Sequence, residues 1–348
     1  MSEATDDVEV VASARFVELP GWLTETYRRA LALRDRWPQA LAVVGPQGIG
    51  KGALAMHFAR ALLCEHPSST SEPCTTCASC RYVAAGQHPD LRVIEPVDVD
   101  EDGNVTSADF IKVDAIRALG AWTQVTSHRR IAKVAVIMPA ERMNVAASNA
   151  LLKTLEEPPA STYLMLVSHQ PGRLLPTIAS RCQRLVVAAP ASVDALSWLS
   201  SHRVRAPESA LAQAGGAPLV ASDLAAEGLQ SERSAWLTAL ANPRSLSPVA
   251  LAARLEAGGR EGRKERLHRA IDWLLAWTAD LARVVAGGEA TRNADFARAL
   301  ATLAPRVATI DLFRYHREVL EQRALIAHPL QPRLVAESLL IDYRALFV

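Results

Sequence analysis

The 348-residue sequence lacks a large net charge, because its 38 lysines and arginines nearly balance its 37 aspartates and glutamates, which leaves +1. A chain without a basic excess has no global electrostatic footprint for nucleic acid, so any DNA contact must be local or shared with partner subunits. No uninterrupted apolar run approaches the roughly 20 residues that a membrane span requires. The acidic start at residues 1–7 also lacks the basic and apolar regions of a signal peptide, so we expect a cytoplasmic chain with no membrane partner.

Internal repeats and low-complexity tracts are also absent, and the length suits two or three domains. From about residue 40 to 190, short apolar runs alternate with amphipathic helical periods. This pattern predicts an α/β fold with a parallel sheet covered on both faces. The expected strands are 40–44, 91–95, 131–137, 162–168 and 184–188, and the clearest helices are 51–63 and 143–157.

Strand-like alternation vanishes beyond Pro190, and helical periods rich in alanine and leucine continue to the end of the chain. Gly215-Gly216-Ala217-Pro218 breaks the first helical group, and Asn242–Ser245 is the best candidate for a linker before the last domain. Within 261–287, apolar residues recur at helical spacing, which predicts a helix that packs in a bundle, against a partner helix or as an internal core stripe.

A phosphate-binding loop of the pattern G-x-x-x-x-G-K-[ST] is present without its final hydroxyl. Gly45, Gly48, Gly50 and Lys51 are in place to hold phosphate, but Gly52 stands where serine or threonine would bind magnesium. The loop is therefore expected to hold a nucleotide weakly or not at all.

The strand expected at 131–137 lacks acids at its end, where Met138-Pro139 follows instead. A P-loop hydrolase needs one carboxylate there to hold magnesium and another to orient the attacking water. Two interpretations remain open. The fold has no nucleotide chemistry of its own, or it is a slow ATPase that uses Lys51, with Glu141 on the following turn as a displaced acid.

Few cysteines are present, and four of the five cluster with the spacing C-x9-C-x2-C-x2-C. These four are Cys64, Cys74, Cys77 and Cys80. Four thiolates in so short a segment suit a structural tetrahedral zinc ion in a module of about residues 64–80. An iron-sulfur cluster is the alternative, but the bacterial ferredoxin pattern would place a further cysteine where Ala84 stands.

The segment Ser148–Pro159, which reads SNALLKTLEEPP, and the later Ser180-Arg181-Cys182 closely resemble bacterial clamp-loader subunits of the AAA+ superfamily. The resemblance extends through Gly86–Leu91, the cysteine spacing and the three-part layout, so it covers essentially the whole chain. Two kinds of DNA polymerase III subunit share these features: the ATP-hydrolysing gamma or tau subunit and the non-hydrolysing delta-prime subunit.

The missing groups make this chain more similar to delta-prime, because the motor subunit carries an intact phosphate loop and an acidic strand end. The motor also has a sensor arginine shortly after a glycine at the start of a lid helix, whereas Gly216 is followed here by Ala217-Pro218. Ser168 matches the first sensor but has little to sense without the acids. A competent gamma- or tau-like ATPase is the alternative interpretation.

The resemblance implies an AAA+ core with a five-stranded sheet and zinc module at 1–190, a small helical lid at 191–242 and an all-α collar at 243–348. Five such subunits form an open ring in that family, so the implied partners are gamma or tau subunits and the delta subunit. The sliding clamp and primed DNA are reached through the complex. The chain itself is expected to lack catalysis while belonging to a DNA-directed DNA polymerase, a nucleotidyltransferase, and binding of ATP or ADP is left open.

Arg181 matches the arginine that the family presents to ATP on the neighbouring subunit, which would make it an arginine finger in trans. The alternative is a local cap or salt bridge. Cys182 is expected to be a small buried residue, since no histidine lies near it in sequence.

Other polar residues have plainer interpretations. Lys153, Glu156 and Glu157 are expected on a solvated helix face or in intersubunit contacts, and His88 as a turn residue rather than a fifth metal ligand. Arg129, Arg130 and Lys133 are candidates for contact with DNA phosphates. A free-standing zinc-dependent DNA-binding protein is disfavoured by the near-neutral charge.

Overall fold

The computed structural model describes residues 16–99, 105–226, 229–257, 259, 262–325 and 331–347, so the acidic start at 1–7 lies outside the described residues. The chain divides after Asp194 into two compact units. Within the described residues, no helix is both long and apolar enough to cross a membrane.

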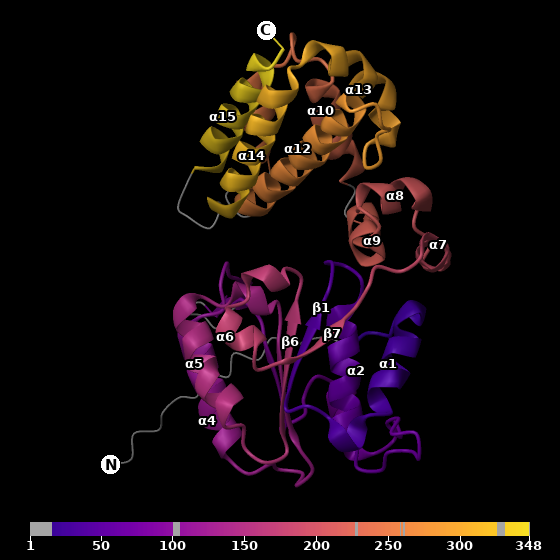
Figure 1. The fold of residues 1–348 in the computed structure, drawn as a ribbon, viewed down its shortest axis with the longest axis vertical. Coiled ribbons are helices and arrows are strands. Elements are labelled where there is room, and N and C mark those ends of the chain that lie inside the picture. Colours follow the sequence, from indigo (N-terminus) through magenta and orange to yellow (C-terminus); the bar gives the residue numbers. More distant parts are fainter. Residues whose placement is uncertain are drawn as a thin grey trace. The chain divides into compact units, whose positions relative to one another are not determined.

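A five-stranded parallel sheet forms the centre of the first unit, with the strand order β2-β5-β6-β1-β7 (Figure 1). Its strands are β1 (Ala40–Val44), β2 (Leu91–Ile94), β5 (Lys133–Ile137), β6 (Thr162–Ser168) and β7 (Gln183–Val186). The five expected strands are therefore present, within two residues at either end. The expected strand at 131–137 begins only at Lys133, the first residue of β5 that pairs with β6.

Helices cover both faces of this sheet because the side chains of each strand alternate between them. Leu41 and Val43 of β1 belong to one buried cluster with α1 (Thr24–Leu31) and α2 (Lys51–Leu63). Ala40, Ala42 and Val44 belong to a second cluster with α4 (Val113–Gln124) and α5 (Val145–Glu156). The first unit is thus a three-layer α/β domain, as expected.

The two predicted helices correspond to α2 and α5. Asn144 caps α5, because its side-chain oxygen accepts a hydrogen bond of 2.7 Å from Ala147 N. The sequence did not single out α1 or α4, nor α3 (Ala78–Ala84), α6 (Pro176–Ala179), and the antiparallel pair β3 (Val97–Val99) and β4 (Val105–Ser107).

The second unit is helical throughout its described residues. Three helices share a small alanine- and leucine-rich cluster around Ala195, Leu199 and Leu211. They are α7 (Ser192–Ser201), whose first turn precedes the division, α8 (Pro207–Gln213) and α9 (Pro218–Ala226). The break at Gly215-Gly216 has positive φ at both glycines, which suits the turn between α8 and α9.

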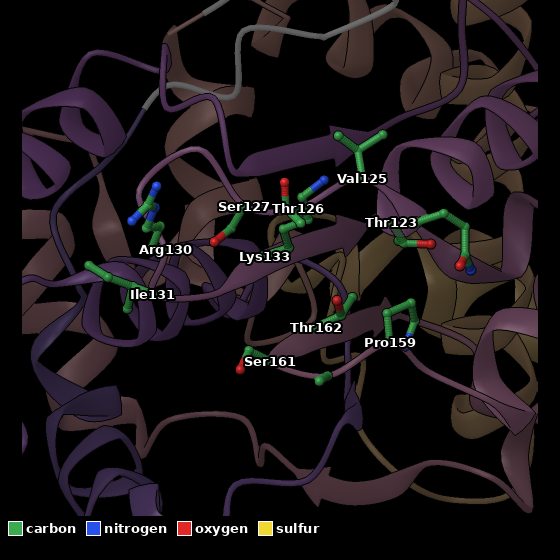
Figure 2. A pocket seen from close by; sticks show the side chains of 12 residues that line it. Thr123, Val125, Thr126, Ser127, Arg130, Ile131, Lys133, Pro159, Ser161 and Thr162 are labelled. Atoms are coloured by element: carbon green, nitrogen blue, oxygen red, sulfur yellow. The ribbon is translucent and has the colours of Figure 1, made fainter.

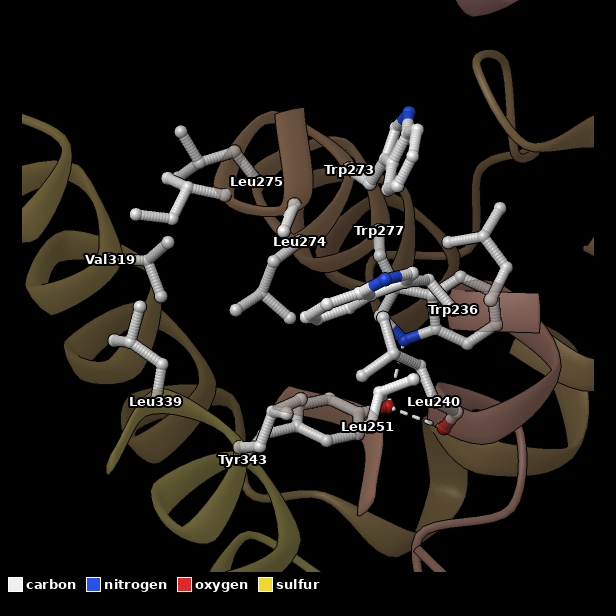
Figure 3. Packing of buried hydrophobic residues seen from close by; sticks show 14 of the residues in the cluster. Trp236, Leu240, Leu251, Trp273, Leu274, Leu275, Trp277, Val319, Leu339 and Tyr343 are labelled. Carbon is white, nitrogen blue, oxygen red and sulfur yellow. Dashed lines mark hydrogen bonds between the residues drawn. The ribbon is translucent and has the colours of Figure 1, made fainter. Parts of the chain in front are cut away.

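A larger cluster joins the remaining helices, which are α10 (Gln230–Leu240), α11 (Pro248–Ala253), α12 (Arg263–Val285), α13 (Ala297–Leu303), α14 (Thr309–Leu325) and α15 (Pro332–Ala345). The apolar positions expected at helical spacing in 261–287 face this cluster on α12, so the internal-core alternative describes them. Figure 3 shows Trp277 donating to the hydroxyl of Tyr343 (2.7 Å), which donates to the carbonyl of Leu240 (2.8 Å). The linker was expected at Asn242, after α10. Because α10 packs against helices that follow this linker, the linker does not separate α10 from the C-terminal cluster.

Candidate functional site

The phosphate-binding loop lies between the carboxyl end of β1 and the start of α2, and its glycines are required by geometry. Gly50 has a φ of +92°, and a Cβ there would lie 2.9 Å from Leu23 Cδ1. A Cβ on Gly45 would lie 2.1 Å from Val187 O. Gly48 also has a positive φ. The loop therefore keeps the tight backbone of a phosphate-binding turn.

Lys51 is folded back onto this loop rather than extended towards solvent. Its side chain is only 2% exposed, and its ammonium donates to Pro46 O. Burial lowers the pKa of Lys51 to about 8, while the charge of Glu141 partly opposes that shift. The loop thus carries a buried lysine in the position that the motif requires.

The two residues that would supply oxygen ligands to magnesium in a P-loop hydrolase are a glycine and a methionine here. A Cβ built on Gly52 would lie 3.2 Å from Sδ of Met138, the residue that follows β5. Magnesium prefers oxygen ligands in near-octahedral geometry, and a thioether is a soft ligand that does not suit it. The two positions at which a hydroxyl and an acid are missing, Gly52 and Met138, therefore lie close together.

Glu141 supports the polypeptide after β6. One of its carboxylate oxygens accepts a hydrogen bond of 3.0 Å from His169 N, and the other is buried without a hydrogen-bond partner among the described residues. Ser168 is fully buried, and its hydroxyl accepts from Gln170 N at 3.2 Å. The charges of Glu141 and Lys51 interact, and burial together with Lys51 lowers the pKa of His169.

The four clustered cysteines converge on one point, with their sulfur atoms all within 4.8 Å of one another. Three backbone N–H groups donate to these sulfurs at 3.2–3.4 Å: Cys74 N to Cys64, Cys77 N to Cys74 and Cys80 N to Cys77. Zn–S bonds of about 2.3 Å in a tetrahedron require sulfurs roughly 3.8 Å apart, so the donor set fits a tetrahedral metal ion. Cys64 and Cys80 are buried, which suits a structural site.

His88 is not part of this metal-ligand group. Its Nδ1 accepts a hydrogen bond of 3.0 Å from Asp90 N, in the turn before β2. The buried Asp90 in turn accepts from the backbone N–H groups of His128 and Arg129, at 2.7 and 2.8 Å. His88 is therefore a turn residue, as expected.

An ion pair beside the cysteines was not predicted. Glu65 directly follows the first cysteine, and its carboxylate accepts from Arg129 and from the hydroxyl of Ser79 (2.8 Å). These interactions hold the pKa of Glu65 well below its usual range, at about 2. Because Glu65 and Arg129 are 64 residues apart, no local pattern could have indicated the pair. It ties the cysteine module to the segment before β5.

The three basic residues considered for DNA have different environments. Arg129 is paired with Glu65. Lys133 is 3% exposed, donates to Trp122 O and lies 4.4 Å from the centroid of the Trp122 ring. Lys133 and Arg130 also line a cavity of about 540 Å³ where β5 and β6 begin (Figure 2). The buried ammonium of Lys133 is therefore unsuited to contact DNA.

Arg181 precedes β7. It therefore lies at the amino ends of the parallel strands, whereas the phosphate loop lies at their carboxyl ends. The parallel register pairs Leu41 with Gln183 and Val44 with Val186, so Arg181 lies beyond one end of β1 and Gly45 beyond the other. At about 3.3 Å per residue the two are roughly 15 Å or more apart. Arg181 makes a 2.7 Å ion pair with Glu156 and donates to Thr177 O at 3.0 Å. The side chain of Arg181 therefore cannot reach the phosphate loop of its own chain.

Comparisons with known proteins identify the family of this chain. A family model described as DNA polymerase III, delta subunit, matches residues 24–191. DNA polymerase III subunit delta' of Pseudomonas aeruginosa is 34% identical over 321 residues, which cover 90% of this chain and 94% of that protein. The chain belongs to the delta-prime family.

Two further relatives place this family among its neighbours. Subunit delta' of Haemophilus influenzae is 30% identical over 265 residues, 74% of this chain and 76% of that protein. Subunit tau of Bacillus subtilis is 34% identical over 172 residues, which cover 49% of this chain but 28% of that protein. The inferred resemblance to delta-prime is therefore confirmed, and the gamma or tau alternative has less direct support.

Proposed function

We propose that this chain is the non-hydrolysing subunit of a clamp loader, which helps to place the sliding clamp on primed DNA during replication. Membership in the delta-prime family supports the replicative role. The observation that carries the absence of hydrolysis is that Gly52 and Met138 stand where a hydroxyl and an acid would be, and that a side chain built on Gly52 would meet the thioether of Met138. Neither residue offers oxygen to magnesium, so the bridging metal of a P-loop hydrolase has no protein ligand at its usual position.

In this proposal Arg181 acts on ATP bound by a neighbouring gamma or tau subunit. Its support is position, because Arg181 is exposed and lies at the opposite end of β1 from the chain's own phosphate loop. A guanidinium that reaches a γ-phosphate stabilises the charge that develops during transfer, which is worth about a thousandfold or more in rate.

We also propose that the C-terminal helices join this chain to the other subunits, in a ring with gamma or tau and delta. Ile310, Phe313 and Leu320 are exposed and share one side of α14. An apolar helical stripe of this kind favours contact with another protein. The exposed β7 next to Arg181 provides a further surface on the first unit.

The metal and the domain division are also part of this proposal. The metal is zinc, since four thiolates in a closed site select it. The chain acts in the cytoplasm.

From the sequence we expect a core at 1–190, a lid at 191–242 and a collar at 243–348. The packing of α10 into the C-terminal cluster favours starting the collar at Gln230 instead.

ATP hydrolysis by the isolated chain and by Lys51→Ala tests the non-hydrolysing assignment against the slow-ATPase alternative. Both proteins are assayed with magnesium, primed DNA and clamp. We expect no turnover above the buffer blank from either protein. Turnover by the isolated chain that disappears in Lys51→Ala would establish the slow ATPase and reject the proposal.

A further inference from the structure

We propose that Glu156 is a positioning residue for Arg181, which holds the guanidinium ready for the neighbouring subunit's nucleotide. This inference rests on the proposed role of Arg181 in trans. It adds a second residue to that function, one that acts through the arginine and does not touch the nucleotide itself.

The base of Arg181 is fixed by two buried neighbours. Ile178 is fully buried on α6, and Cys182 is packed in the same cluster between the sheet and α5. Burial raises the pKa of the Cys182 thiol to about 11, so this cysteine stays a neutral core residue. The polypeptide that carries Arg181 is therefore anchored on both sides, and only the long side chain remains to be oriented.

Two interactions orient that side chain. Nη1 donates to Thr177 O at 3.0 Å, one helical turn back, and Nη2 makes the 2.7 Å ion pair with Glu156. Glu156 is the last residue of α5, where a negative charge is unfavourable because it faces the negative end of the helix dipole. The positive charge of Arg181 offsets the negative charge of Glu156, which favours the ion pair at this helix end.

The pair still leaves the guanidinium able to bind phosphate. A guanidinium carries five N–H donors, and the two interactions use one donor from each terminal nitrogen. The side chains of Arg181 and Glu156 are 37% and 50% exposed. An exposed pair is weak enough to shift as a subunit docks, yet it narrows the rotamers that an arginine would otherwise sample.

A matched set of variants in the reconstituted loader tests this positioning role. The loader carries silencing substitutions in the phosphate loops of its other ATP sites, so that hydrolysis reports the site facing this chain. The variants are Arg181→Ala, Glu156→Ala, Glu156→Gln, the double variant Glu156→Ala with Arg181→Ala, and Glu157→Ala as the control. Glu157→Ala removes the same charge from the next residue, which is exposed and for which the structure records no ion pair.

We expect Glu156→Ala to lower kcat about two- to fivefold with KM unchanged, the effect of losing one exposed ion pair. Glu156→Gln keeps a hydrogen-bond acceptor, so its kcat should stay within about twofold of the kcat of the unaltered chain. The kcat of Glu157→Ala should equal that of the unaltered chain. The double variant should equal Arg181→Ala, because Glu156 acts only through the arginine. Thermal unfolding and loader assembly should not change, which separates positioning from a structural role.

Two results would overturn the proposal in different ways. If Arg181→Ala slows hydrolysis but Glu156→Ala is as fast as or faster than the unaltered chain, Glu156 is not a positioning residue while the trans finger stands. If Arg181→Ala has no effect, the proposed trans role fails and the role of Glu156 fails with it.

Discussion

Among single residues, Lys51 is a buried lysine whose ammonium donates to Pro46 O and interacts with the charge of Glu141, so its effect on stability can be measured apart from function. Its pKa of about 8 lies below the ordinary 10.5. Between these values the unfolded chain binds more protons than the folded chain, so this group adds stability as pH rises from about 8 to 10.5. Below pH 8 the full cost of burial is present.

Lys51→Met should therefore stabilise the isolated chain at pH 7, by about 1–2 kcal/mol after loss of the hydrogen bond to Pro46 O. The gain should shrink between pH 8 and 10.5 as the lysine of the unaltered chain deprotonates. Urea unfolding of both proteins at pH 7 and pH 9.5 measures this difference. If the two proteins were equally stable at each pH, or if the variant were less stable than the unaltered chain at pH 7, Lys51 would not be a buried cation.

The limit of sequence reasoning at this scale is visible at Gly52 and Met138. The sequence indicates that both magnesium ligands are missing, but their residues are 86 positions apart, and only the structure places Sδ of Met138 against Gly52. The ion pair of Glu65 with Arg129 was missed for the same reason. A local salt bridge was considered for Arg181, but its partner Glu156 was not identified. Contacts between distant segments depend on strand order and helix packing, which no local pattern encodes.

Among the elements, the cysteine module is the part whose structure we expect to depend most directly on a ligand. The surrounding hydrogen bonds lower the pKa of Cys74 to about 6, whereas burial raises that of Cys80 to about 12. A metal must displace the remaining thiol protons to bind, so affinity should rise with pH above about 6.

Removing the metal should loosen residues 64–80 and leave the sheet intact, because the two clusters that flank the sheet do not need the cysteines. We expect one metal ion per chain, a thermal midpoint several degrees lower after chelation, and faster proteolysis within 64–80. Metal analysis, calorimetry and limited proteolysis measure these effects. Cys182→Ala should keep the metal and Cys77→Ser should lose it, and full metal content in Cys77→Ser would contradict the assignment.

Elements that are buried runs or that carry clear end signals were predictable. β1 and β5 are buried at every position, and α5 lies between Asn144 and Pro158-Pro159. The helices α1 and α4 were not singled out, although they form the outer layers. The pair β3 and β4 is only three residues long on each side, too short for a period of two to emerge.

For the whole molecule, the two units pose a question of domain boundaries that packing can answer. Trp236, Leu237 and Leu240 of α10 are buried in the same cluster as α12 and α15. A fragment of residues 229–348 should therefore fold cooperatively, whereas 243–348 lacks three buried side chains worth about 1.5–3 kcal/mol each. Urea unfolding and binding of a hydrophobic dye compare the two fragments. Equal stability would support the boundary at 243.

The whole molecule resembles a motor from which the chemistry has been removed while the scaffold is kept. The sheet, the phosphate loop and the arginine before β7 are present, but Gly52 and Met138 stand where the magnesium ligands would be. In our proposal this chain contributes to hydrolysis only through another subunit, so its function would require assembly.

ATP hydrolysis at the loader site facing this chain, measured with Arg181 intact or replaced by alanine, tests that claim most directly. Arg173→Ala, an exposed arginine in the turn before α6, serves as the control. We predict that Arg181→Ala slows that site by about a thousandfold without loss of assembly, while Arg173→Ala changes nothing. Undiminished hydrolysis with Arg181→Ala would contradict the account.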